Sequence, residues 1–224
     1  MFRKVPVILC LVICLIFLGL FTWESLDKKE GETFYRNVLP STNIKDINKL
    51  ENEYEGATGY IDIPNTSISY PIMQGEDNSY YLKHLPNGDR NKMGSIFLDY
   101  RNNGFNDKNT IIYGHNFNNG TMFSDLLNYK SFEFYKNHSN YKIYTSDKVI
   151  EVAIFAVYIA DATKDELPIN FESTDFDDYL DMVLESNLIN SEVSIDSEDN
   201  LITLCTCSNG SWKNRLIVIG KVLN

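Results

Sequence analysis

From Gly56 to the carboxyl terminus, the chain alternates short apolar runs with turn-forming residues, a pattern typical of β-strands joined by tight loops. The candidate strands are residues 58–63, 68–74, 94–100, 109–115, 140–145, 148–160, 201–207 and 216–222. Many short strands with few helices favour a sheet that closes on itself, because closure leaves no unpaired edge. We therefore predict a mainly β fold, a closed or nearly closed barrel of about eight strands.

Two strands and two helical regions carry further expectations. The run 109–115 is nearly all apolar, which predicts burial on both faces. Pro71 favours an edge position for the second strand, because proline has no N–H to give to a ladder. Residues 121–135 predict one or two short helices, and the apolar face of residues 175–187 predicts a helix inserted before the strand 201–207.

The amino-terminal segment differs in composition from the rest. Arg3 and Lys4 precede an uncharged apolar run over 5–23, which as a helix spans roughly 28 Å, close to the thickness of a bilayer core. This predicts a cytoplasmic tail (1–4) and an uncleaved transmembrane signal anchor (5–23), because cations stay on the cytoplasmic side. A cleaved signal peptide and a lipoprotein site at Cys14 are the alternatives, and both lack the small residues that cleavage requires.

The position of the anchor predicts localisation to the cell membrane as a single-pass protein with its catalytic domain outside the cell. Residues 24–55 are polar with apolar residues near helical spacing, and a break at 40–42 predicts two short helices that form a stalk. The barrel domain then occupies residues 56–224. The chain carries a net charge of −11, which argues against a nucleic-acid partner because phosphate binding needs clustered cations.

Cys205 and Cys207 lie two residues apart on one predicted strand, about 6.6–6.8 Å between Cα atoms with both side chains on one face. That separation is at the upper edge of disulfide geometry, so a bridge is not expected. It is also poor geometry for zinc, and no fourth ligand is evident, so we expect neither a metal nor a cofactor.

Three reactive side chains fall at predicted strand ends. Cys207 ends the strand 201–207, Arg215 stands at the start of the strand 216–222, directly before its first residue, and His115 ends the strand 109–115. If the last two strands pair as a hairpin, Cys207 and Arg215 face each other across it, and His115 can reach the same rim. A thiol, an imidazole and a guanidinium are the groups needed to attack a peptide carbonyl through sulfur.

Four motifs in this order resemble the sortases, the membrane-anchored transpeptidases of Gram-positive bacteria. Thr203-Leu204-Cys205-Thr206-Cys207 followed by Arg215 resembles the cysteine signature of that family. Three further features resemble the class B branch of the family. They are Tyr113-Gly114-His115-Asn116 with Gly120-Thr121-Met122-Phe123, the segment Asp77-Asn78-Ser79-Tyr80-Tyr81-Leu82, and the predicted helix before the cysteine strand. The resemblance covers about residues 56–224 and implies a sortase-like barrel.

The resemblance implies a cysteine transpeptidase of the thiol-peptidase type. Cys207 would be the nucleophile that cleaves a carboxyl-terminal sorting signal after threonine, His115 the general acid and base, and Arg215 the group that positions substrate and stabilises the oxyanion. The implied partners are secreted proteins with an LPxTG- or NPQTN-like signal, a peptidoglycan precursor amine as acceptor, and the cytoplasmic membrane through residues 5–23.

The resemblance also suggests substrate-groove residues, namely Asn78, Leu82, Cys205, Thr206 and Ser208. Cys205 departs from the family pattern, which more usually has a small hydroxyl residue there, so it either lines the groove or packs in the core. For Asn78 and Leu82 the alternative is a turn that packs on the barrel. Two alternative functions stay open, a cysteine hydrolase with the same site and a non-catalytic envelope protein that binds peptide or metal.

Overall fold

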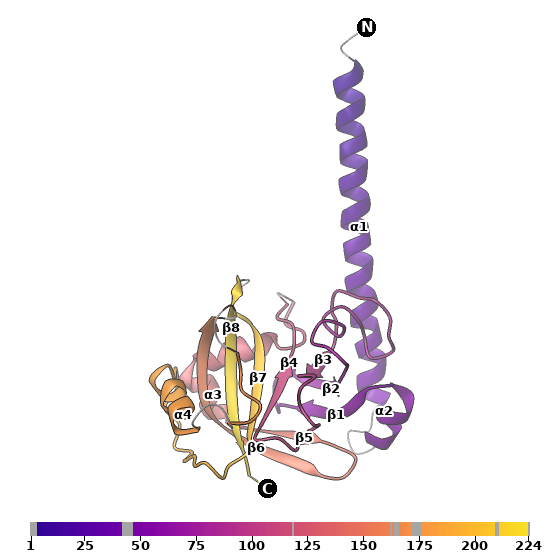
Figure 1. Cartoon of the computed structure of the whole chain (residues 1–224). Helices are drawn as coiled ribbons and strands as arrows, with labels where there is room; N and C mark the ends of the chain where they lie inside the picture. Colours follow the sequence, from indigo (N-terminus) through magenta and orange to yellow (C-terminus); the bar gives the residue numbers. More distant parts are fainter. Residues whose placement is uncertain are drawn as a thin grey trace.

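The computed structural model describes residues 4–41, 47–117, 119–161, 163, 166–171, 176–208 and 211–223. In chain order the elements are α1 (Lys4–Ser41), α2 (Ile47–Glu53), β1 (Ala57–Asp62), β2 (Ser69–Met73), β3 (Ile96–Leu98), β4 (Asn109–Tyr113), the 3-10 helix η1 (Ser124–Lys130), α3 (Phe132–Asn137), β5 (Asn140–Tyr144), β6 (Val149–Asp161), α4 (Phe176–Glu185), β7 (Leu201–Ser208) and β8 (Ser211–Val222) (Figure 1). Each predicted strand is present, and the predicted helices of the barrel domain correspond to η1, α3 and α4.

The strands form a closed barrel in the order β1-β2-β3-β4-β7-β8-β6-β5, which confirms the predicted fold class. Most neighbours are antiparallel, but β2 with β3 and β4 with β7 are parallel pairs. A parallel neighbour needs a long crossover. Between β4 and β7 that crossover contains η1, α3, β5, β6 and α4, and it brings the carboxyl ends of β4 and β7 together at one end of the barrel.

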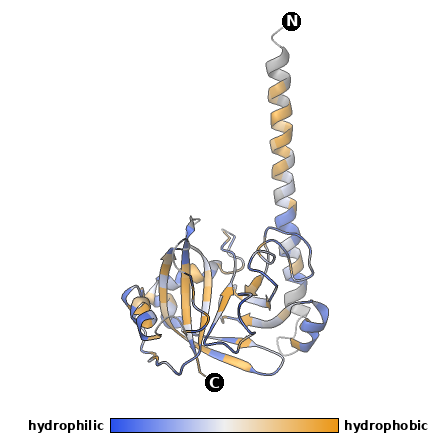
Figure 2. Ribbon diagram, in the orientation of Figure 1, coloured by the Kyte–Doolittle hydropathy of each residue, from blue (hydrophilic) through white to orange (hydrophobic). Residues whose placement is uncertain are grey.

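Strands β4 and β7 are buried on both faces, as the apolar run at 109–115 predicts for β4. Ile112 and Leu204 belong to the interior core, whereas Ile111 and Cys205 belong to a second apolar layer on the outer face. Phe176 of α4 packs in that outer layer. Apolar residues accordingly colour the neighbouring strands β4, β7 and β8 in Figure 2. Burial of this kind fixes the register, since a one-residue slip would exchange the two faces.

Pro71 does not mark an edge strand, because β2 has a neighbour on each side of the closed barrel. Its ladder to β3 comprises only Ile72 and Met73, and Pro71 itself is paired with Tyr60 of β1. The missing N–H is therefore tolerated because the contact with β3 begins one residue later.

The amino-terminal helices differ from the prediction. Helix α1 does not end at residue 23 but continues through the polar segment to Ser41, and α2 follows at Ile47–Glu53. The residues between them, 42–46, lie outside the described part of the chain. Helix α1 projects from the barrel, and only its carboxyl-terminal part lies against it, where Tyr35 is buried (Figure 1).

The predicted transmembrane anchor over 5–23 is contradicted. Of the helices among the described residues, none combines the length and the apolar character that crossing a bilayer requires. The apolar run is instead the first part of α1, which continues without interruption into charged residues. The predicted single-pass localisation is therefore contradicted. The predicted membrane partner is not confirmed, and residues 1–3 of the predicted cytoplasmic tail lie outside the described residues.

Candidate active site

The register of three strands brings the predicted catalytic residues to one end of the barrel. Tyr113 of β4 pairs with Cys205 of β7, so His115, two residues further on, lies level with Cys207. On the other side of β7, Cys207 pairs with Arg215 of β8. The predicted hairpin pairing of Cys207 with Arg215 is thus confirmed for the backbone. The side chains of residues 207 and 208 lie outside the described part of the structure.

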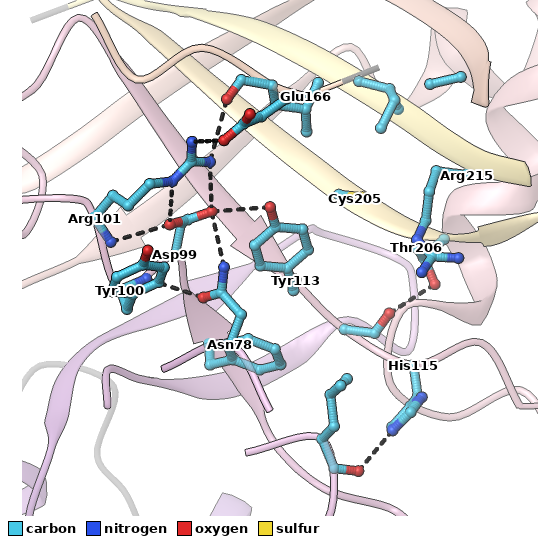
Figure 3. A pocket seen from close by; sticks show the side chains of 16 residues that line it. Asn78, Asp99, Tyr100, Arg101, Tyr113, His115, Glu166, Cys205, Thr206 and Arg215 are labelled. Atoms are coloured by element: carbon cyan, nitrogen blue, oxygen red, sulfur yellow. Dashed lines mark hydrogen bonds and ion pairs between the residues drawn. The ribbon is translucent and has the colours of Figure 1, made fainter. Parts of the chain in front are cut away.

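A cavity of about 510 Å³ opens beside these strand ends (Figure 3). The predicted site residues with described side chains all line it: Asn78, Leu82, His115, Cys205, Thr206 and Arg215. Cys205 is a buried thiol that is 3% exposed and belongs to the outer apolar layer. It therefore contributes both to the cavity wall and to the packing beneath α4, the two alternatives that the sequence leaves open.

A hydrogen bond from Thr206 fixes the end of β4 against β7. The Thr206 hydroxyl donates to the carbonyl of Gly114 over 2.7 Å, and the Gly114 amide donates to the carbonyl of Cys205 over 3.2 Å. These bonds hold the residue directly before His115 against the residue directly before Cys207. Because the Thr206 side chain is 1% exposed and its proton is already donated, we propose that it positions the two strand ends.

His115 has a defined tautomer. Its Nε2 lies 2.8 Å from the carbonyl oxygen of Leu82, and a carbonyl can only accept, so Nε2 carries the proton and Nδ1 holds the lone pair. Burial lowers the pKa of His115, and the nearby Arg215 cation lowers it further, although the bond to Leu82 acts in the opposite direction. The neutral imidazole is therefore favoured at neutral pH, which suits a group that must accept a proton.

A buried carboxylate that sequence reasoning missed supports the cavity wall. Asp99 is fully buried, and Arg101 donates to both of its carboxylate oxygens over 2.9 Å. Tyr113 donates its hydroxyl to Asp99 over 2.9 Å (Figure 3). Burial acts against the charge, but the hydrogen bonds from Arg101 and Tyr113 outweigh it and lower the pKa of Asp99. The carboxylate therefore stays ionised in the wall of the cavity.

Asn78 is oriented by this carboxylate. Its Nδ2 donates to Asp99 over 3.1 Å, and its Oδ1 accepts from the amide of Tyr100 over 3.0 Å. The bonds at both ends assign the amide, so Asn78 has one remaining N–H to offer a ligand in the cavity. The segment around it is a turn, in which Asp77 accepts from the amides of Ser79 and Tyr80.

Two residues that follow β6, Glu166 and Leu167, also line the cavity. Arg101 donates to the carboxylate of Glu166 over 2.7 Å and to the carbonyl of Leu167 over 3.2 Å. The signal that could have found this network is an acidic residue at the end of an apolar run, 94–98, with an arginine two residues later. A charge in that position must be paired once the strand is buried.

Comparison with known proteins decides the family. Residues 61–223 match the model of the sortase domain. The chain belongs to the sortase family. It is 39% identical over 204 residues to sortase B of Listeria monocytogenes, an alignment that covers 87% of this chain and 80% of that protein.

Solved sortase B structures share the fold of this sortase. That of Clostridium perfringens is 30% identical, with a TM-score of 0.74 over 79% of this chain and 99% of that one. A complex of Staphylococcus aureus sortase B with a substrate is 28% identical, with a TM-score of 0.75 over 90% of this chain and 94% of that one. These relatives place the chain in class B of a family of cysteine transpeptidases.

Proposed function

We propose that this sortase cleaves a carboxyl-terminal sorting signal after threonine and transfers the acyl group to a cell-wall amine, with residues 56–224 as the catalytic domain. The observation that carries the proposal is the pairing of Cys207 with Arg215 across β7 and β8, level with His115 on β4. This pairing supports the proposal because it brings a cysteine, an arginine and a histidine to the same end of the barrel.

The first half-reaction forms a thioester. The sulfur of Cys207 attacks the threonine carbonyl as His115 takes up the thiol proton, and Arg215 stabilises the negative charge that develops on the carbonyl oxygen. The carbon–nitrogen bond then breaks, and His115 returns the proton to the departing amine. Reference pKa values of about 8.5 for cysteine thiols make the thiolate a minority species at neutral pH, so proton transfer accompanies attack.

The second half-reaction regenerates the thiol. An acceptor amine attacks the thioester carbon, the carbon–sulfur bond breaks, and the proton lost by the amine passes through His115 to the sulfur of Cys207. Because the His115 imidazole is favoured in its neutral form, it is ready to accept that proton. Water in place of the amine would give the hydrolase reaction from the same intermediate.

The cavity wall supports recognition of an extended peptide. Asn78 offers an N–H to a peptide carbonyl, while Leu82 and Cys205 supply apolar surface. We propose that these residues contact the sorting signal and that Ser208, whose side chain lies outside the described residues, borders the same groove. The carboxylate of Asp99 already accepts hydrogen bonds from Asn78 and Tyr113, so we propose that it acts on the peptide only through these two side chains.

A peptide library tests the proposal. The purified chain is incubated with peptides bearing varied LPxTG- and NPQTN-like signals, with and without an amine acceptor, and the products are identified by mass spectrometry. We expect cleavage on the carboxyl side of threonine and a new amide bond when the amine is present. Release of the free acid at the same rate in both conditions would favour the hydrolase, and no cleavage of any peptide would contradict the proposal.

A further inference from the structure

The carbonyl group that fixes the tautomer of His115 belongs to a segment that is held on both sides. It is the carbonyl of Leu82, and Nε2 of His115 lies 2.8 Å from its oxygen (Figure 3). The carbonyls of the two neighbouring residues, Tyr81 and Lys83, accept from the main-chain amides at the two ends of the segment 91–95, each over 2.8 Å. The position of the Leu82 carbonyl therefore depends on where this short segment lies.

Helix α1 binds this segment through two side chains. Tyr35 of α1 is 4% exposed, and its hydroxyl donates to the carbonyl of Gly94 over 2.7 Å. Earlier in α1, the main-chain carbonyl of Asp27 accepts from Nδ2 of Asn91 over 2.6 Å. Oδ1 of Asn91 accepts from the amide of Met93 over 2.9 Å, so both ends of this buried side chain are bound. Figure 1 shows the segment between β2 and β3 beside the carboxyl-terminal part of α1.

Close packing accompanies these hydrogen bonds. An added Cβ at Gly31 of α1 would lie 2.8 Å from Oδ1 of Asn91, and one at Gly94 would lie 2.8 Å from the carbonyl oxygen of Leu82. Helix α1, the segment 91–95 and Leu82 are therefore in contact as successive layers, with no room for a methyl group at these two points. A shift of α1 is transmitted to the Leu82 carbonyl, because packing this close leaves no gap to absorb it.

Helix α1 also contacts the segment that follows His115. Glu32 accepts from Nδ2 of Asn119 over 2.9 Å. The ring of Phe117 lies against the imidazole, with the two ring centroids 5.3 Å apart, and the amide of Phe123 donates to the carbonyl of His115 over 2.8 Å. One helix is thus joined to the segments on both sides of the imidazole.

We infer, on the basis of the proposed transpeptidation, that α1 positions His115, with Tyr35 and Asn91 as positioning residues that hold the Leu82 carbonyl against Nε2. A neutral imidazole has two tautomers, and a hydrogen bond at one nitrogen selects between them. If the Leu82 carbonyl moves away, part of the protein carries the proton on Nδ1, and Nδ1 then has no lone pair with which to accept a proton from a thiol or an amine.

NMR of the full chain tests the inference without catalysis. The nitrogen shifts of the His115 ring report its tautomer, and they are measured at pH 8, above the ordinary histidine pKa of about 6.5, so that the neutral ring is observed. Tyr35→Phe removes one buried hydroxyl that donates to a carbonyl. Tyr129→Phe is the matched control, because the buried Tyr129 donates its hydroxyl to the carbonyl of His138 over 2.8 Å, a bond in which Leu82 takes no part.

We expect Tyr35→Phe to raise the population of the Nδ1-protonated tautomer at least threefold, and Tyr129→Phe to leave it unchanged. Asn91→Ala is the second variant, which loses the bond to α1 but keeps the main-chain amide that binds Lys83, and it should change the tautomer in the same direction. Urea unfolding measures the stability of each variant. An unchanged tautomer in both Tyr35→Phe and Asn91→Ala, or an equal change in Tyr129→Phe, would overturn the inference.

A kinetic measurement separates positioning from peptide binding. With a sorting peptide and an amine acceptor, we expect Tyr35→Phe to lower kcat about threefold and to leave KM within about twofold, because the imidazole changes and the peptide cavity does not. A change in KM alone would overturn the positioning role. A chain that cleaves no peptide would fail the proposed function, and the NMR measurement would then decide by itself whether α1 fixes the tautomer of His115.

Discussion

Arg215 lies directly opposite Cys207 in the antiparallel ladder between β7 and β8. Directly opposed residues in such a ladder have Cβ atoms about 4.5–5.5 Å apart, so the register alone puts the arginine on the strand next to that of the cysteine. The ladder is held from both sides, because Arg215 also pairs with Ala160 of β6. The proposed oxyanion role of Arg215 therefore rests on a residue whose backbone pairs with a strand on each side.

Replacing Arg215 by lysine is expected to lower kcat/KM for a sorting peptide at least tenfold. Lysine keeps the charge but loses the planar fork of donors that can bind a carbonyl oxygen and a second group together. The melting temperature should change little, because the backbone pairing is unaffected. Full activity of Arg215→Lys would argue against the oxyanion role and leave only a charge requirement.

His115 is expected to titrate below the ordinary histidine pKa of about 6.5, because burial and the Arg215 cation both disfavour its charged form. Removing the cation with Arg215→Gln should raise the pKa of His115 but leave it below 6.5, since burial is the larger cause. NMR titration of the imidazole measures both, with His115→Gln identifying its signal among three histidines. A pKa above 6.5 in the unaltered chain would contradict this environment.

Replacing Asp99 by asparagine is expected to cost about 3 kcal/mol at pH 7, because it leaves Arg101 without its buried partner. The folded-state pKa of Asp99 is lowered, so its charge stabilises the fold above the unfolded pKa of about 4, and that contribution is lost as pH falls through the folded value. In urea unfolding from pH 7 to pH 3, the difference in stability between the two proteins should therefore narrow as the pH falls below 4. A constant difference would show that packing, not charge, explains the cost.

Gly94→Ala is expected to disturb His115 through Leu82. Gly94 has φ +61°, and an added Cβ would lie 2.5 Å from the carbonyl oxygen of Tyr81 and 2.8 Å from that of Leu82, the partner of His115. Gly104→Ala is the matched control, because Gly104 has φ +57° with nothing within 4 Å.

Both substitutions should cost about 1 kcal/mol for the left-handed backbone, measured by urea unfolding. Only Gly94→Ala should cost more and shift the His115 imidazole signals in the NMR spectrum. If the two variants behave alike, the contact of Gly94 with the Leu82 carbonyl does not position His115.

The barrel could be predicted because each of its strands has a recognisable pattern in the local sequence. Runs such as 109–115 and 201–207 are too apolar to face water, and turn residues separate them. The pairing of Cys207 with Arg215 could also be predicted, because a hairpin links residues that are near in the sequence. The parallel pairing of β4 with β7 joins strands far apart in the chain, and the sequence permitted it without requiring it.

The hydrogen-bond network around Asp99 could not be predicted from such local sequence patterns. Asp99 meets Glu166 only through Arg101, across a separation in sequence that no local pattern reports. The unbroken course of α1 could not be predicted either: the change from apolar to polar composition at residue 24 indicates separate helices, whereas one helix continues to Ser41 and packs Tyr35 against the barrel domain. Helical propensity and tertiary contact outweighed the change in composition there.

In the proposed reaction Cys207 carries the acyl group, and intact-protein mass spectrometry detects that intermediate. The chain is mixed with a sorting peptide without an amine acceptor, quenched in acid and digested to locate the adduct. Cys205→Ala serves as the matched control, since it removes the neighbouring thiol on the same strand. We predict a hydroxylamine-sensitive thioester at Cys207 in the unaltered chain and in Cys205→Ala, and none in Cys207→Ala; an adduct that persists in Cys207→Ala would show that Cys207 is not the nucleophile.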